Sequence, residues 1–121
     1  MEPEVAKRLF DALQAGRRIQ VFTDTLSFEQ FAASELVRSA TERQFEIIGE
    51  ALGKAAEVDP SLAEQMPDLP RIVGLRNRLI HGYDSVDDEI VWDIVQTRIP
   101  QLIDLLEALL GKSGFPTEVV E

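Results

Sequence analysis

The sequence predicts an all-α protein, folded as an up-and-down bundle of four main helices with short helical turns between them. Apolar residues recur at helical spacing along most of the chain, and no segment alternates as a strand would. Helix-start signals and prolines separate these periodic segments. The 121 residues, 45% hydrophobic and 28% charged, suit one soluble globular domain.

Two long helices are predicted in the first half of the chain. The first covers residues 3–22, with Pro3 near its first turn, and its apolar positions are Val5, Leu9, Ala12 and Ile19. A turn follows at residues 23–26. Ser27 and Gln30 then form the Ser-x-x-Gln pattern of a capping box, and a second helix continues from there to about Val58.

A short helix and a longer one are predicted in the middle of the chain. Ser61-x-x-Glu64 begins the short helix, and Pro67 ends it. The longer helix covers residues 70–81, opened by Pro70, with Gly82 placed as its left-handed C-cap.

The last long helix follows a loop at residues 83–87. Its apolar residues follow a 3,4,3,4,3 spacing that suits packing in a bundle or across a dimer: Trp92, Val95, Ile99, Leu102, Leu106 and Leu109. Pro100 lies inside this helix and should kink it or remove one backbone bond. We expect one domain over residues 1–110 and a flexible tail over residues 111–121.

Composition limits the possible functions. The net charge of −10 argues against a broad nucleic-acid-binding surface, so any nucleic acid must meet a local basic patch, for which Arg71, Arg76 and Arg78 are the candidates. With zero cysteines and one histidine, a zinc site is not expected, and no cofactor is indicated. No apolar run suggests a membrane span, so a cytoplasmic protein is expected.

The segment from Arg76 to Tyr83 holds the only histidine and the only tyrosine of the chain. RNA cleavage without a metal requires that the 2′-hydroxyl lose a proton, that the phosphorane be stabilised, and that the 5′-oxygen gain a proton. Arg76 can stabilise charge on a phosphate, and His81 can move protons. Asn77 lies four residues before His81 and could orient its ring or the substrate.

Helix geometry sets a condition on this chemistry. Five residues of ideal helix separate Arg76 and His81 by about 140°, at ~100° per residue. The two groups converge only if His81 swings out at the helix end, or if a two-fold dimer completes the site. The simpler alternative is a capped helix end with a solvated Arg-x-Arg face.

Two sets of carboxylates have alternative readings. Glu42, Glu46 and Glu50 form an i, i+4 row that is either a solvated face, offset by Arg38 and Arg43, or a row from which Glu46 lines the cleft. The aspartates after the motif either cap the next helix or bind a metal, and capping is favoured; they are Asp84, Asp87 and Asp88.

Three segments resemble the HepT branch of the HEPN superfamily. They are residues 42–51, the motif Arg76-Asn77-Arg78-Leu79-Ile80-His81-Gly82-Tyr83, and Val91-Trp92. The resemblance implies a helical homodimer that acts as a metal-independent ribonuclease toxin of a type VII toxin–antitoxin system, with Arg76 and His81 catalytic. It also implies a partner, an MntA-type minimal nucleotidyltransferase antitoxin, which neutralises the toxin by transferring AMP to Tyr83.

These observations support two hypotheses about the function. The first is an endoribonuclease whose cleft is built from Arg76, Asn77 and His81 of two subunits, supported by Arg78 and Glu46. The second is a non-catalytic module that binds a nucleotide or the nucleotidyltransferase, which the acidic net charge favours.

Overall fold

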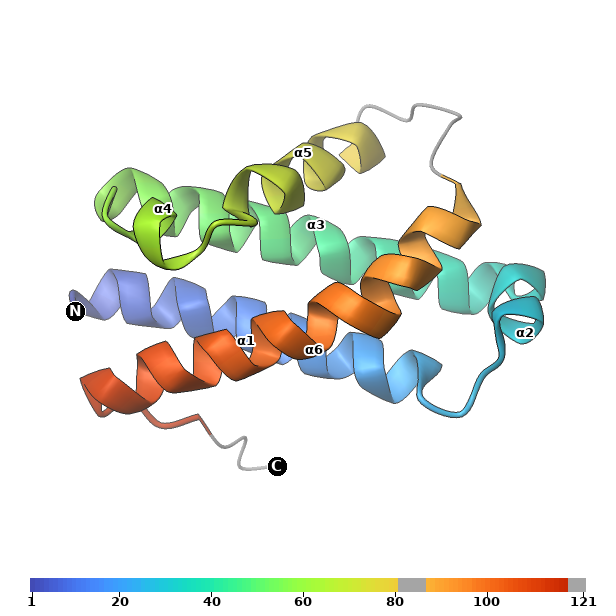
Figure 1. The fold of residues 1–121 in the computed structure, drawn as a ribbon, viewed down its shortest axis with the longest axis horizontal. Helices are drawn as coiled ribbons and strands as arrows, with labels where there is room; N and C mark the ends of the chain where they lie inside the picture. Colours follow the sequence, from blue (N-terminus) through green and yellow to red (C-terminus); the bar gives the residue numbers. More distant parts are fainter. Residues whose placement is uncertain (81–86, 118–121) are drawn as a thin grey trace.

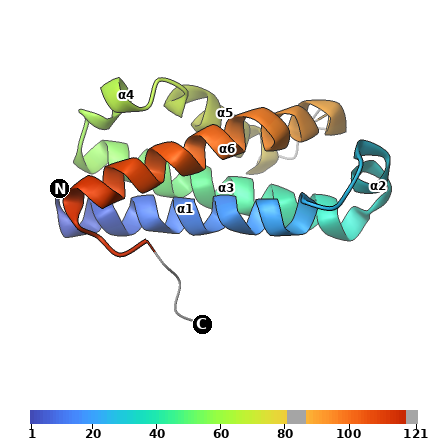
Figure 2. The ribbon, with the colours of Figure 1, turned by 60° about the horizontal axis from the view of Figure 1, so that its bottom comes forward.

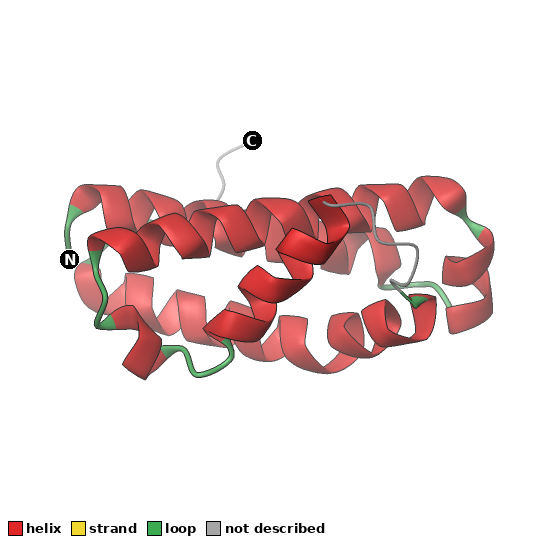
Figure 3. Cartoon of the chain, turned by 90° about the horizontal axis from the view of Figure 1, so that it is seen from above, coloured by secondary structure: helices red, strands yellow, loops and turns green. Residues whose placement is uncertain are grey.

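The computed structural model describes residues 1–80 and 87–117, and within α5 the side chains of residues 76 and 78–80 lie outside that description. The described part consists of helices and connecting loops (Figure 3). The helices are α1 (Pro3–Thr23), α2 (Phe28–Ala33), α3 (Glu35–Val58), α4 (Leu62–Gln65), α5 (Leu69–Ile80) and α6 (Asp88–Ser113). The predicted all-α bundle of four main helices plus short ones is confirmed.

The four long helices alternate in direction along the chain (Figure 1). Helix α3 lies between α1 and α5, whereas α6 packs against α1. The short α2 touches both α3 and α6 at one end of the bundle, and α4 connects α3 to α5 at the other (Figures 1 and 2). Consequently α5 has one neighbouring long helix, while α1 has two.

The core is built from the apolar faces that the periodicity predicts. Val5, Leu9 and Ile19 of α1 are fully buried, and Leu106 of α6 is buried with them. Trp92, at the start of the predicted seam, is half-buried and packs its ring against Phe31 of α2, with 5.2 Å between the ring centroids. The seam therefore belongs to the core of the single chain.

The helix predicted from residue 27 to residue 58 is broken at Ser34, so that prediction was wrong. Ser34 adopts an extended conformation that ends α2 and begins α3. Its hydroxyl accepts a hydrogen bond from the backbone N–H of Val37 at 3.2 Å, which makes it the N-cap of α3. The capping box at the start of α2 is confirmed, because the Ser27 hydroxyl and the Gln30 side chain each accept the other residue's backbone N–H.

Other helix ends differ from prediction by a few residues. Ser61 makes no side-chain cap, and its hydroxyl donates instead to Asp59 at 2.6 Å. Helix α6 passes through both Pro100 and Gly111 and ends at Gly114, whose φ of 75° is the left-handed conformation of a glycine C-cap. The segment expected as a tail is thus helical as far as Ser113.

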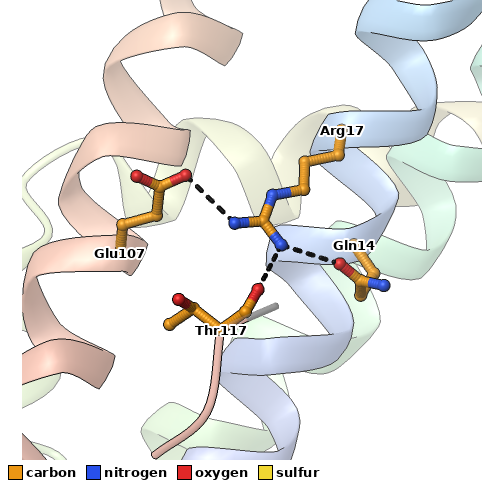
Figure 4. Close-up of polar contacts among 4 residues, drawn as sticks. All are labelled: Gln14, Arg17, Glu107 and Thr117. Carbon is orange, nitrogen blue, oxygen red and sulfur yellow. Dashed lines mark hydrogen bonds and ion pairs between the residues drawn. The ribbon is translucent and has the colours of Figure 1, made fainter. Parts of the chain in front are cut away.

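The residues after α6 turn back onto α1. Phe115 stacks on Phe10 with 5.4 Å between ring centroids. Arg17 of α1 binds the Glu107 carboxylate at 3.2 Å and also donates to Gln14 and to the carbonyl of Thr117 (Figure 4). Residues 114–117 are therefore packed on the bundle, and residues 118–121 lie outside the described residues.

Candidate functional site

Helix α5 carries the predicted site at its C-terminal end. Leu69 is buried, Ile72, Val73 and Leu75 are partly buried against the core, and Pro70 lies in the first turn, where a missing N–H costs nothing. The helix begins at Leu69, one residue before the predicted start. A Cβ placed on Gly53 of α3 would lie 3.8 Å from the Val73 side chain, so the two helices meet closely there.

The charge of α5 differs from that of the rest of the chain. Its twelve residues include three arginines and no carboxylate, whereas every other helix contains at least one glutamate or aspartate. In a chain of net charge −10, this helix alone offers a local positive field without an internal counter-charge. That composition favours contact with an anionic ligand.

The predicted site residues are only partly within the described structure. Arg76 and Arg78 occupy the last turns of α5, but their side chains lie outside the description. His81, Gly82, Tyr83 and Asp84 all lie outside the described residues, and so does the proposed convergence of Arg76 with His81. Asn77 is exposed on α5.

Glu46, predicted as a supporting residue, lies on α3 with its side chain 25% exposed. Its carboxylate is 3.1 Å from the guanidinium of Arg43, one turn earlier on the same helix. Since α5 runs antiparallel to α3 (Figure 1), the end of α5 is directed toward the first half of α3, where Glu46 lies. The expected offset of the glutamate row by Arg43 is confirmed for this residue.

Glu42, one turn before Glu46, has the most perturbed environment of the described carboxylates. Burial raises its pKa above the ordinary value, and the nearby Asp88 carboxylate raises it further. The Arg38 guanidinium acts in the opposite direction, but it is also 3.9 Å from Asp88. The sequence placed Glu42 in the glutamate row but did not single it out, because its shift depends on burial and on Asp88, which comes from a different helix.

Asp87 caps α6, as the preferred reading of the aspartates after the motif predicted. Its side chain accepts a hydrogen bond from the backbone N–H of Glu89 at 2.8 Å. Among residues 1–80 and 87–117, no cluster of histidine, cysteine and acidic side chains has the composition of a metal site. Within the same residues, no helix combines the length and apolar character that a bilayer span requires.

An apolar groove runs between α5 and α6, with α3 as its floor. Its volume is about 370 Å³, and its lining includes Phe45 and Ile48 of α3, Ile72 and Leu75 of α5, and Ile94 and Leu105 of α6. At the start of α5, an ion pair of 3.0 Å between Asp68 and Arg98 links the two walls. Spacing along one helix cannot show such a groove, because its walls come from segments distant in sequence.

Comparison with known proteins places this architecture in a family. Residues 12–109, most of the chain, match the family model described as "Ribonuclease HepT-like". A Methanocaldococcus jannaschii protein named "Putative RNase MJ1380" is 33% identical over 82% of this chain and 90% of its own length. "Probable ribonuclease HepT" of Thermococcus cleftensis is 32% identical over 84% of this chain and 91% of its own length.

No solved structure matches the chain significantly. The family match nevertheless covers residues 42–51, 76–83 and 91–92, the three segments of the resemblance. The chain belongs to the HepT-like ribonuclease family of the HEPN superfamily.

Proposed function

We propose that this protein is the toxin of a HepT/MntA-type (type VII) toxin–antitoxin system and acts as a metal-independent endoribonuclease. Family membership and the names of its relatives support the reaction class. The observation that carries the proposal is the position of the motif in the chain: Arg76 lies near the end of α5, the helix with three arginines and no carboxylate, and His81 follows the last residue of that helix in the sequence. Phosphate is therefore attracted to this end of an otherwise acidic protein.

The proposed reaction uses only side-chain chemistry. The 2′-oxygen attacks the adjacent phosphorus as its proton passes to one imidazole, and the 5′-oxygen leaves with a proton from a second. Arg76 stabilises the charge on the phosphorane through paired hydrogen bonds. Because ideal helix geometry separates Arg76 and His81 by about 140°, a homodimer that brings two α5 ends together supplies both imidazoles in one cleft.

Mixing two inactive variants tests this shared cleft. Arg76→Ala and His81→Ala should each lose RNA cleavage, because each homodimer lacks one kind of group entirely. A mixed dimer should regain part of the wild-type activity, because its shared cleft again holds one Arg76 and one His81. Cleavage should also persist with an excess of chelator. If verified mixed dimers recover no activity, the composite site is contradicted. If the wild-type protein loses activity with chelator, metal independence is contradicted.

Inactivation is proposed to occur when a nucleotidyltransferase antitoxin transfers AMP from ATP to the Tyr83 hydroxyl, with release of pyrophosphate. The added phosphate would place negative charge beside the arginines at the end of α5 and block the cleft. Coexpression with a candidate nucleotidyltransferase, followed by intact-mass measurement, should show added AMP. Tyr83→Phe should lose that mass shift and remain toxic, whereas an unchanged shift in Tyr83→Phe would reject this residue as the acceptor.

The acidic net charge favours one alternative, a non-catalytic module that binds a nucleotide or the nucleotidyltransferase. This alternative predicts that purified protein associates with the transferase but cleaves no RNA under any condition. RNA cleavage that depends on His81 would exclude it.

A further inference from the structure

The groove between α5 and α6 combines an apolar interior with an unpaired cation on its wall. Arg71 of α5 lines the groove and is exposed. Within residues 1–80 and 87–117, no carboxylate lies within ion-pair distance of its guanidinium. Arg98, on the opposite wall, is instead paired with Asp68 at 3.0 Å. Arg71 is therefore the available anion-binding group of this groove.

The groove adjoins the proposed cleavage site. Arg71 precedes Arg76 by five residues, which is about 7.5 Å along the helix and about 140° around it, at ~1.5 Å and ~100° per residue. A strand whose scissile phosphate is held at the end of α5 must therefore cross the surface of this helix to reach Arg71 and the groove, a path that a few unstacked nucleotides can span.

The interior of the groove suits an unstacked base. Its walls are mostly aliphatic, and Ile94 and Leu105 of α6 face Ile72 and Leu75 of α5 across it. The volume of about 370 Å³ falls in the range of small-ligand sites. Proteins that bind single-stranded RNA place splayed bases between apolar surfaces and hold the adjoining phosphates with arginine.

We propose that this groove is a nucleotide subsite, in which Arg71 holds a phosphate a few nucleotides from the cut and the apolar walls hold the neighbouring base. The inference rests on the proposed ribonuclease function and makes Arg71 a substrate-positioning residue. It also gives the acidic protein a means of selecting single-stranded RNA, because a base in a duplex cannot enter the groove.

Binding measured apart from cleavage tests the subsite. In a His81→Ala background, Arg71→Gln should weaken binding of a short, labelled single-stranded RNA about five- to tenfold, and should lower the slope of log affinity against log salt by roughly 0.7. Arg18→Gln is the matched control, since Arg18 is an exposed arginine that lines a different cleft, between α1 and α3. It removes the same charge and should change the affinity less than about twofold.

A second variant tests the interior. Ile94→Trp fills the groove from a half-buried position and should weaken RNA binding severalfold without lowering the helix content measured by circular dichroism. Equal affinities for the Arg71 and Arg18 variants would overturn the subsite, while His81-dependent cleavage would leave the proposed function standing. A second outcome would also overturn the subsite. If Arg71→Gln or Ile94→Trp dissociates a dimer and leaves the RNA affinity unchanged, the groove is an interface with a second copy of the chain.

Discussion

The two outer helices of the bundle, α6 and α5, are held in very different ways. Helix α6 lies so close to α1 that a Cβ on Gly16 would be 3.2 Å from Ile103. The Arg17 contacts with Glu107 and Thr117 secure the same interface. Helix α5 packs on α3 along one side and borders the apolar groove on the other. Helix α6 buries eight of its side chains, whereas Leu69 is the buried one among the described side chains of α5. We therefore expect α1, α3 and α6 to provide most of the stability, and the proposed chemistry belongs to the motif that begins in α5.

Truncating one leucine on each side should give the largest difference in stability. Leu106 of α6 is fully buried, so Leu106→Ala should lower the free energy of unfolding by about 2–5 kcal/mol. Leu75 of α5 is half-buried on the groove wall, where solvent or neighbouring atoms can fill the space, and Leu75→Ala should cost about 1 kcal/mol. Chemical denaturation of both variants measures the contrast, and equal losses would show that α5 is as tightly packed as α6.

Glycines on the two helices should respond with opposite signs. Gly16→Val forces its side chain against Ile103 and should lower the free energy of unfolding by about 1–3 kcal/mol. Nothing lies within 4 Å of a Cβ on Gly74 of α5, so Gly74→Ala should raise stability by up to about 1 kcal/mol through helix propensity. Thermal unfolding distinguishes the signs, and a stabilised Gly16→Val protein would show that the α1–α6 interface has room to spare.

The smallest effect concerns Glu42, where α3 meets the start of α6. Its pKa is raised in the folded protein, mainly by burial and then by Asp88. Below its ordinary pKa the group is protonated in both states and costs nothing. As pH rises through the folded pKa, the carboxyl ionises in an unfavourable environment, and the free energy of unfolding falls by the full cost of that ionisation.

Glu42→Gln should therefore melt at a slightly higher temperature than wild type near neutral pH. The difference should shrink as pH falls through the raised pKa of the folded protein, and it should vanish below about 4.5, the ordinary value for this group. Glu57→Gln, on an exposed residue near the other end of α3, controls for the change in net charge. A Glu42→Gln advantage that is equal at every pH would show that the cause is not the ionisation of this carboxyl.

Periodicity and helix-start signals predicted most of the fold. Pro3, the Ser27–Gln30 capping box and the Asp87 cap all act where the sequence placed them. The break at Ser34 was missed because neither glycine nor proline marks it, and a serine inside a helical pattern is ambiguous until its hydroxyl is seen to accept a bond. A flexible tail was predicted from residue 111, but the helix continues to Ser113 and the left-handed C-cap is Gly114.

The candidate site was less accessible to sequence reasoning. Local spacing identified the motif from Arg76 to Tyr83, because its groups are close neighbours in sequence. The shift at Glu42 and the groove beside Arg71 both depend on α6, which follows later in the chain. Spacing within one helix carries no information about which side chains of another helix lie opposite.

The central claim is that the motif beginning in α5 carries the proposed cleavage, while the other long helices provide the stability. The most direct test measures RNA cleavage by purified His81→Ala together with its melting temperature. The account predicts at least a hundredfold loss of cleavage with a melting temperature close to that of wild type. Cleavage at the wild-type rate by a folded His81→Ala protein would contradict it.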